Sequence, residues 1–199
     1  DAKTPDYIRR HALLCRLRQL GEVNGATPAA LIALADNLGR VGIYACLAPL
    51  EAMVEHADAS VRAAVLRAVR QLYFKRSFVL VMRGLADPDA SVRQEALAAV
   101  GTLHFGHAFA PLQRIFRDSQ DAAVRSAALG AISKIPNLEA AELLLEVLSH
   151  GTPAERQQAG DLLKRADHPD VLAMLQRAHG DETGEMKGRI AQVLQARGR

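Results

Sequence analysis

The side chains that could carry chemistry in this sequence are few, and the only closely spaced histidines are His104 and His107. They lie within the segment "LHFGH", and a pair of imidazoles is a possible start for a metal site. A metal would need further ligands arranged around the pair, and Gly106 favours a turn there over a rigid helical pair. We therefore expect no metal site.

The two cysteines, Cys15 and Cys46, are too few for a disulfide framework or a zinc site. Both sit among apolar residues, so we interpret them as buried thiols of a protein in a reducing compartment. The sequence also offers no nucleophile with a positioned base, no phosphate-binding glycine loop and no evident carboxylate pair. We expect no catalytic residues and no cofactor.

One group of polar residues does recur at a fixed spacing. The segment "DASVR" occupies residues 58–62 and 89–93, and "DAAVR" occupies residues 121–125. Extending the alignment gives six equivalent positions at intervals of 31 or 32 residues: Thr27, Asp58, Asp89, Asp121, Thr152 and Thr183. Asp and Thr are favoured helix N-caps, and a proline follows two of them, so each position predicts the start of a helix.

Apolar residues follow each predicted cap at offsets of 3, 7 and 11, which lie on one face of a helix. Val92, Ala96 and Val100 are one such set. A second apolar helical pattern precedes each cap, as in Phe78, Val81 and Leu85, so each repeat is predicted to be a pair of helices, A then B. The six units span approximately residues 5–40, 41–73, 74–104, 105–136, 137–167 and 168–199.

The composition agrees with helices packed through small aliphatic side chains. Hydrophobic residues make up 49% of the 199 residues, aromatic residues only 4%, and tryptophan is absent. The longest apolar run, "VGIYACLAPL", is too short to cross a bilayer, so we expect a soluble, cytoplasmic protein. The chain begins at Asp1 rather than Met, which suggests one domain taken from a longer polypeptide.

The B-helix pattern "DASVRQEALAAVGTL" resembles the HEAT repeat, in the short form common in bacteria and known from phycobilisome lyase-type proteins. The resemblance covers essentially the whole chain, although Leu31 and Lys187 replace the arginine in the first and last units. It implies an all-α fold: an α-solenoid of about six stacked helix pairs in a right-handed superhelix. The B helices would line its concave side. The signatures of tetratricopeptide and ankyrin repeats are absent.

The recurring Asp and Arg residues are predicted to hold neighbouring repeats together. Each arginine follows its cap by four residues and could pair with the cap Asp of the adjacent unit, although ligand contact is the alternative role. This structural ladder consists of Asp58, Arg62, Asp89, Arg93, Asp121 and Arg125.

Offsets 5, 9 and 12 point away from the apolar stripe and should line the concave groove. The predicted partner-binding residues there are Arg67, Arg70, Gln94, Ser126 and Ser133, and unit five contributes Gln157, Asp161 and Lys164. Lys75 and Arg76 add to a basic patch within residues 59–93, whereas residues 135–185 are rich in Asp and Glu. This asymmetry favours an acidic partner, with an ordinary solvated surface as the alternative.

We interpret the chain as a non-catalytic scaffold, adaptor or regulatory module that binds a protein segment in its groove. Two alternatives stay open. The resemblance to bacterial HEAT-like bilin lyases and isomerases would make it an enzyme, although no bilin-binding motif is recognisable. Some HEAT-like glycosylases hold DNA in a basic groove, but the formal net charge of only +3 and the acidic second half disfavour nucleic acid. The His-Glu pairs of HEAT-like di-iron hydroxylases are missing.

Overall fold

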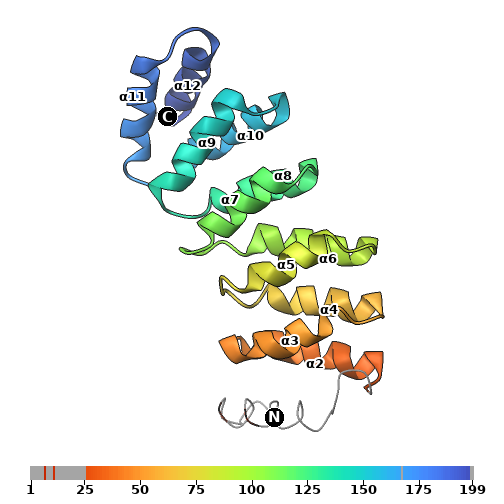
Figure 1. Ribbon diagram of the computed structural model, residues 1–199. Helices are drawn as coiled ribbons and strands as arrows, with labels where there is room; N and C mark the ends of the chain where they lie inside the picture. The colour runs from red at the N-terminus through yellow and green to blue at the C-terminus, as the bar shows by residue number, and fades with distance from the viewer. Residues whose placement is uncertain (1–6, 8–10, 12–25, 167, 198–199) are drawn as a thin grey trace. The chain divides into compact units, whose positions relative to one another are not determined.

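The computed structural model describes residues 7, 11, 26–166 and 168–197, and over these ranges it contains helices and no β-strand (Figure 1). The chain divides into two compact units, residues 1–103 and residues 104–199. This division falls within one residue of the predicted boundary between the third and fourth repeats. Cys15 lies outside the described residues.

The first unit stacks three B helices, with shorter A helices laid against them. α4 lies between α2 and α6, while α3 packs on α4 and α5 packs on both α4 and α6. The elements are α2 (Pro28–Val41), the 3₁₀ turn η2 (Tyr44–Cys46), α3 (Leu47–Met53), α4 (Ala59–Val69), α5 (Ser77–Leu85) and α6 (Ala90–Thr102). Cys46 is buried here, as predicted.

The second unit continues the alternation of A and B helices. α7 pairs with α8, α9 with α10, and α11 with α12, while α10 also contacts α8 and α12. The elements are α7 (Phe109–Asp118), α8 (Ala122–Ile132), α9 (Leu138–His150), α10 (Pro153–Lys164), α11 (Val171–Asp181) and α12 (Gly184–Arg197). Each predicted repeat after the first therefore holds one helix pair.

Five of the six predicted caps, Thr27, Asp58, Asp89, Asp121 and Thr152, begin the B helices through the expected hydrogen bonds. Asp58 and Asp89 each accept from a backbone N–H two residues later at 2.8 Å, and Asp121 accepts from the N–H groups of Ala123 and Val124. Thr152 and Glu155 form a complete capping box. These bonds satisfy N–H groups that a first helical turn leaves open, which explains why Asp and Thr recur.

The apolar stripe of the B helices forms the core. At offset 7, the buried positions are Leu34, Val65, Ala96, Ala128, Ala159 and Ile190. The positions at offset 11 are also buried from Leu38 through Leu163, whereas Leu194 at the end of the stack is half-buried. The predictions of an all-α fold and of stacked helix pairs are thus confirmed.

Two glycines allow helices of the first unit to approach each other closely. A Cβ atom on Gly39 would lie 2.9 Å from the Cα atom of Ala68, so α2 and α4 meet at this point backbone to backbone. A Cβ atom on Gly84 would lie 2.3 Å from a methyl carbon of Leu66. A larger residue at Gly39 would force α2 and α4 apart, because the contact there is with backbone atoms. A larger residue at Gly84 would require the Leu66 side chain to move.

No helix among the described residues is both long enough and apolar enough to cross a membrane.

Candidate functional site

The recurring arginine closes the loop of its own repeat. Arg62 donates from Nη1 to the carbonyl oxygens of His56 and Ala57 at 2.8 and 3.0 Å. Arg93 binds the carbonyl oxygens of Asp87 and Pro88 in the same way, and Arg156 binds that of Gly151. These bonds satisfy backbone carbonyls of the A-to-B connection, so the side chain fixes the angle at which the B helix begins.

The predicted partner of this arginine was wrong. Arg62 pairs bidentately with Asp87 of the next repeat, with both N–O distances 2.8 Å, and Asp87 lies two residues before the cap Asp89. The caps are already engaged, because Asp58 and Asp89 each accept from the N–H and the hydroxyl of a serine in their own helix. An ion pair therefore does join the two repeats at this point, but its carboxylate is Asp87 rather than the predicted cap Asp89.

Arg125 makes the corresponding link in the second unit. Its Nε donates to Glu155 at 2.6 Å, its Nη1 donates to the Phe116 carbonyl at 2.7 Å, and its guanidinium carbon lies 4.1 Å from the centre of the Phe116 ring. Glu155 also accepts from the Thr152 N–H, so one carboxylate serves both the capping box and the inter-repeat ion pair. The cap residue of this adjacent repeat, Thr152, is neutral and could not form an ion pair with Arg125.

These contacts lower the pKa of the carboxylates that make them. The hydrogen bond from Arg62 lowers the pKa of Asp87, and the hydrogen bond from Arg125 lowers the pKa of Glu155. The Ser60 hydroxyl lowers the pKa of Asp58, and the Ser91 hydroxyl does the same for Asp89. The pKa of each of the four carboxylates is therefore below its ordinary value, which is 3.8 for Asp and 4.5 for Glu.

We predict that the free energy of unfolding falls as the pH drops below these ordinary values. A carboxylate whose pKa is lower in the folded state stabilises that state at pH values above its unfolded pKa. This contribution is lost as the pH falls through the folded pKa. Urea titrations at a series of acidic pH values should show a declining midpoint. A midpoint that is constant from neutral pH to well below the ordinary carboxylate values would contradict these contacts.

The predicted groove residues Arg67 and Arg70 line a hollow in the first unit. Its volume is about 430 Å³, and Gln71, Tyr73 and Thr102 complete the lining. We call it the Tyr73 hollow. The Tyr73 residue is 52% exposed, so a large aromatic surface faces solvent beside two guanidinium groups.

Ion pairs with two acidic side chains partly neutralise these arginines. Arg67 lies 3.4 Å from Asp36 and 3.5 Å from Glu95, and Arg70 lies 3.4 Å from Glu95. Sequence reasoning missed both carboxylates, although a signal was present. Asp36 follows Thr27 by nine residues, as Arg67 follows Asp58, so the two side chains occupy equivalent places on adjacent B helices.

The other predicted site residues lie in different surroundings. Gln94 and Lys75 are exposed, and Arg76 is engaged with Glu51 through two hydrogen bonds of 2.7 and 2.9 Å. Ser126 lies on α8 in the second unit and is exposed, and Ser133 directly follows α8 as its C-cap residue. Ser133 is half-buried and donates to the Gly130 carbonyl at 2.9 Å. The structure therefore brings Arg67 and Arg70 together in one hollow that the other predicted residues do not line.

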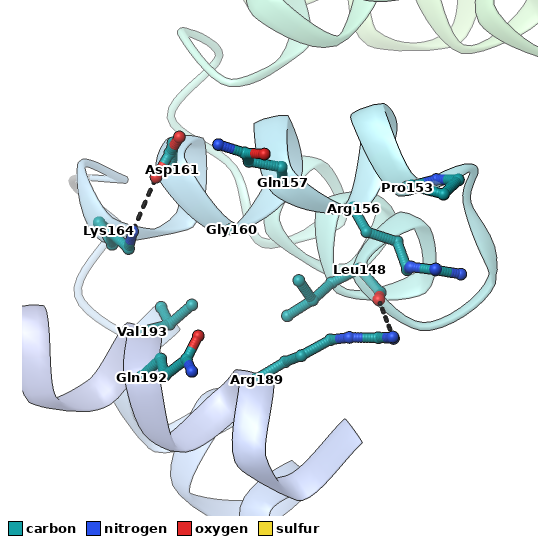
Figure 2. A pocket seen from close by; sticks show the side chains of 10 residues that line it. All are labelled: Leu148, Pro153, Arg156, Gln157, Gly160, Asp161, Lys164, Arg189, Gln192 and Val193. Carbon is teal, nitrogen blue, oxygen red and sulfur yellow. Dashed lines mark hydrogen bonds and ion pairs between the residues drawn. The ribbon is translucent and has the colours of Figure 1, made fainter. Parts of the chain in front are cut away.

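A second hollow lies in the second unit between α10 and α12, and we call it the α10–α12 groove. Its volume is about 390 Å³. Figure 2 shows α10 along one wall and α12 along the other. The lining residues are Leu148, Pro153, Arg156, Gln157, Gly160, Asp161, Lys164, Arg189, Gln192 and Val193. Gln157, Asp161 and Lys164 are the three positions that offsets 5, 9 and 12 assigned to the groove in unit five.

The titratable side chains do not gather into a metal centre in the part of the chain that the structure describes. No group of three or more His, Cys, Asp and Glu side chains there is placed to hold an ion. The Nδ1 atom of His104 is buried and has no hydrogen-bond partner among the described residues. The hollows described above are lined instead by arginine, lysine, amide and tyrosine side chains, which bind other molecules through charge and hydrogen bonds.

Comparison with known proteins finds a family match for part of the chain. Residues 78–159 match the family model for HEAT repeats. No curated protein matches the sequence.

Two solved structures are similar to the whole chain at low sequence identity. Human deoxyhypusine hydroxylase in complex with glycerol is 16% identical, with a TM-score of 0.40, and the match covers 100% of this chain and 92% of that one. The complex of CpcE and CpcF of phycocyanin lyase from Nostoc sp. PCC7120 is 17% identical, with a TM-score of 0.37. That match covers 98% of this chain and 91% of the other.

Proposed function

Because residues 78–159 are HEAT repeats, we propose that this chain is a non-catalytic scaffold or adaptor that binds a segment of another protein on its B helices. Stacked repeats leave a continuous surface on which residues can vary without disturbing the core. The observation that carries the proposal is the Tyr73 hollow, in which Arg67 and Arg70 lie beside an exposed aromatic ring.

The ion pairs around the Tyr73 hollow are weak enough for a carboxylate of a partner to replace them. The ion pairs of Arg67 and Arg70 have N–O distances of 3.4 to 3.5 Å, and the two arginine side chains are 45% and 38% exposed. Exposed pairs of this kind contribute only about 0 to 1 kcal/mol each. A carboxylate on a partner could therefore replace Asp36 or Glu95 at little cost, and Tyr and Arg are residue types that dominate binding energy in protein interfaces.

A binding role agrees with how the recurring residues are used. Asp58 and Asp89 cap helices, Arg62 and Arg93 close loops, and the apolar stripe fills the core. Since stacking accounts for the repeated positions, the residues that differ between repeats are those available for specificity. This reasoning favours a module that holds its partner over one that transforms it.

Reversing both charges in the Tyr73 hollow should weaken partner capture. We expect Arg67→Glu with Arg70→Glu to weaken binding of the native partner at least about tenfold, because the acidic segment would then meet like charge. The free energy of unfolding should fall by no more than about 1 kcal/mol for each of the three ion pairs that are lost, since both arginine side chains are exposed. Affinity purification from the native host, followed by titration of the identified partner, measures the first effect.

The matched control is Arg114→Glu, which reverses one charge at a side chain that is 77% exposed on α7. It should retain the partner. Unchanged affinity in the double variant would remove the Tyr73 hollow from the binding surface. A covalent change in the mass of the purified partner after incubation with the chain would overturn the non-catalytic role.

A further inference from the structure

We propose that the α10–α12 groove of the second unit is a separate binding site for an acidic segment of polypeptide in extended conformation. The inference rests on the proposed function in that the occupant is a protein segment. It concerns a different surface, with its own residues and its own charges.

The shape of the groove fits an extended chain. The lining residues of α10 recur every three or four positions from Pro153 to Lys164, so they follow one face of this helix along its length. Eleven residues of helix span about 16 Å. At about 3.3 Å per residue, this length accommodates about five residues of extended polypeptide. A single small anion would fill only one end.

The charges of the groove favour an anionic occupant. Three cationic side chains line it, Arg156, Lys164 and Arg189, against one acidic side chain, Asp161. Asp161 is already paired with Lys164 at 2.7 Å. Arg189 pairs with Glu185, which is exposed outside the lining, and Arg156 donates to a backbone carbonyl, so the lining keeps an excess of positive charge.

Both arginines gather at one end of the groove. Arg156 donates to the Gly151 carbonyl at 3.0 Å, and Arg189 donates to the Leu148 carbonyl at 3.3 Å, so both lie at the C-terminal end of α9. Figure 2 shows the two side chains extending toward the same side. These carbonyls are neutral, and the carboxylate that Arg189 contacts, Glu185, is 82% exposed. Further N–H donors of the guanidinium groups can bind a carboxylate of the occupant.

Amide side chains and an apolar floor complete the site. Gln157 on α10 and Gln192 on α12 are both exposed and line the groove from opposite walls. Each amide can donate to a carbonyl and accept from an N–H group, as an extended backbone requires. Leu148, Gly160 and Val193 also line the groove and are buried, which provides apolar contact for alternate side chains of the occupant.

The test uses the whole chain and a peptide that carries its label on the N-terminal amine, fluorescein-Glu-Leu-Glu-Leu-Glu-amide, at low salt. We expect saturable binding, and we expect Gln157→Glu with Gln192→Glu to weaken it at least about fivefold through like-charge repulsion. Both changes leave the arginine contacts at the end of α9 in place. Gln195→Glu is the matched control, because Gln195 is exposed on α12 but does not line the groove.

Further measurements decide whether the peptide occupies this groove. Backbone amide shifts should concentrate in residues 153–164 and 189–193, and added salt should weaken binding. The inference is overturned if the peptide shows no saturable binding, if its lysine counterpart binds equally well, or if Gln195→Glu weakens it as much as the double variant. Loss of the peptide only in Arg67→Glu with Arg70→Glu would instead locate it in the Tyr73 hollow. That outcome would support the proposed function and refute this site.

Discussion

Replacement of Val92 by Asp is expected to lower the free energy of unfolding by about 3 to 5 kcal/mol, the largest stability effect that we predict. Val92 is 1% exposed at the start of α6, on the apolar stripe that packs against α4 and α5. A carboxylate there would lose its hydration, and the apolar residues of the stripe cannot donate hydrogen bonds to it. Thermal and urea unfolding followed by circular dichroism measure the loss.

The control for this substitution is Gln94→Asp, which places the same side chain two residues later on the exposed face of α6. Its cost should be limited to the small difference in helix propensity, a few tenths of a kcal/mol. Equal melting temperatures for Val92→Asp and the unmodified chain would show that the assignment of the stripe to the core is wrong.

Replacement of Glu155 by Ala should cost about 2 to 3 kcal/mol, because one carboxylate holds two structures together. Its side chain is 11% exposed, accepts from Arg125 at 2.6 Å and from the Thr152 N–H at 2.8 Å, and thus links α8 to the start of α10. Removal leaves the half-buried Arg125 without this carboxylate and removes half of the capping box. Urea unfolding of the variant measures the cost.

A double-mutant cycle separates the two contributions. If the ion pair matters, Glu155→Ala and Arg125→Ala together should cost less than the sum of the single changes, by about 1 kcal/mol. Glu142→Ala, on the exposed face of α9, is the control and should be nearly neutral. Strict additivity of Glu155→Ala and Arg125→Ala would mean that the two side chains act independently.

The binding surfaces could be anticipated only in part. Offsets 5, 9 and 12 correctly assigned Gln157, Asp161 and Lys164 to one face of α10, because helical periodicity alone fixes which positions share a face. The same reasoning could not show that α12 lies opposite, or that Gln192 and Val193 complete the groove. Those contacts depend on the distance between the two B helices, and the side chains of both helices together set that distance.

Charge was the least predictable feature. The excess of basic residues at 59–93 is present in the sequence, yet Asp36 and Glu95 lie beside Arg67 and partly cancel it. A count along the chain cannot include a carboxylate that stacking brings from another repeat. The same limitation explains the mistaken partner of Arg62, because Asp87 and Asp89 are two residues apart and only the cap hydrogen bonds decide which one is available.

The sequence by itself determined the helices, their N-caps and the buried stripe, since these follow from local hydrogen bonding and from a period of 3.6 residues. The tertiary structure alone decided that Arg125 reaches Glu155, that the Tyr73 hollow opens beside Arg67 and Arg70, and that Arg156 and Arg189 meet at the end of α9. These pairings join residues that are far apart in the chain, 30 positions for Arg125 and Glu155 and 41 for Leu148 and Arg189. Their geometry is set by the packing of one repeat on the next, and no local rule of the chain encodes it.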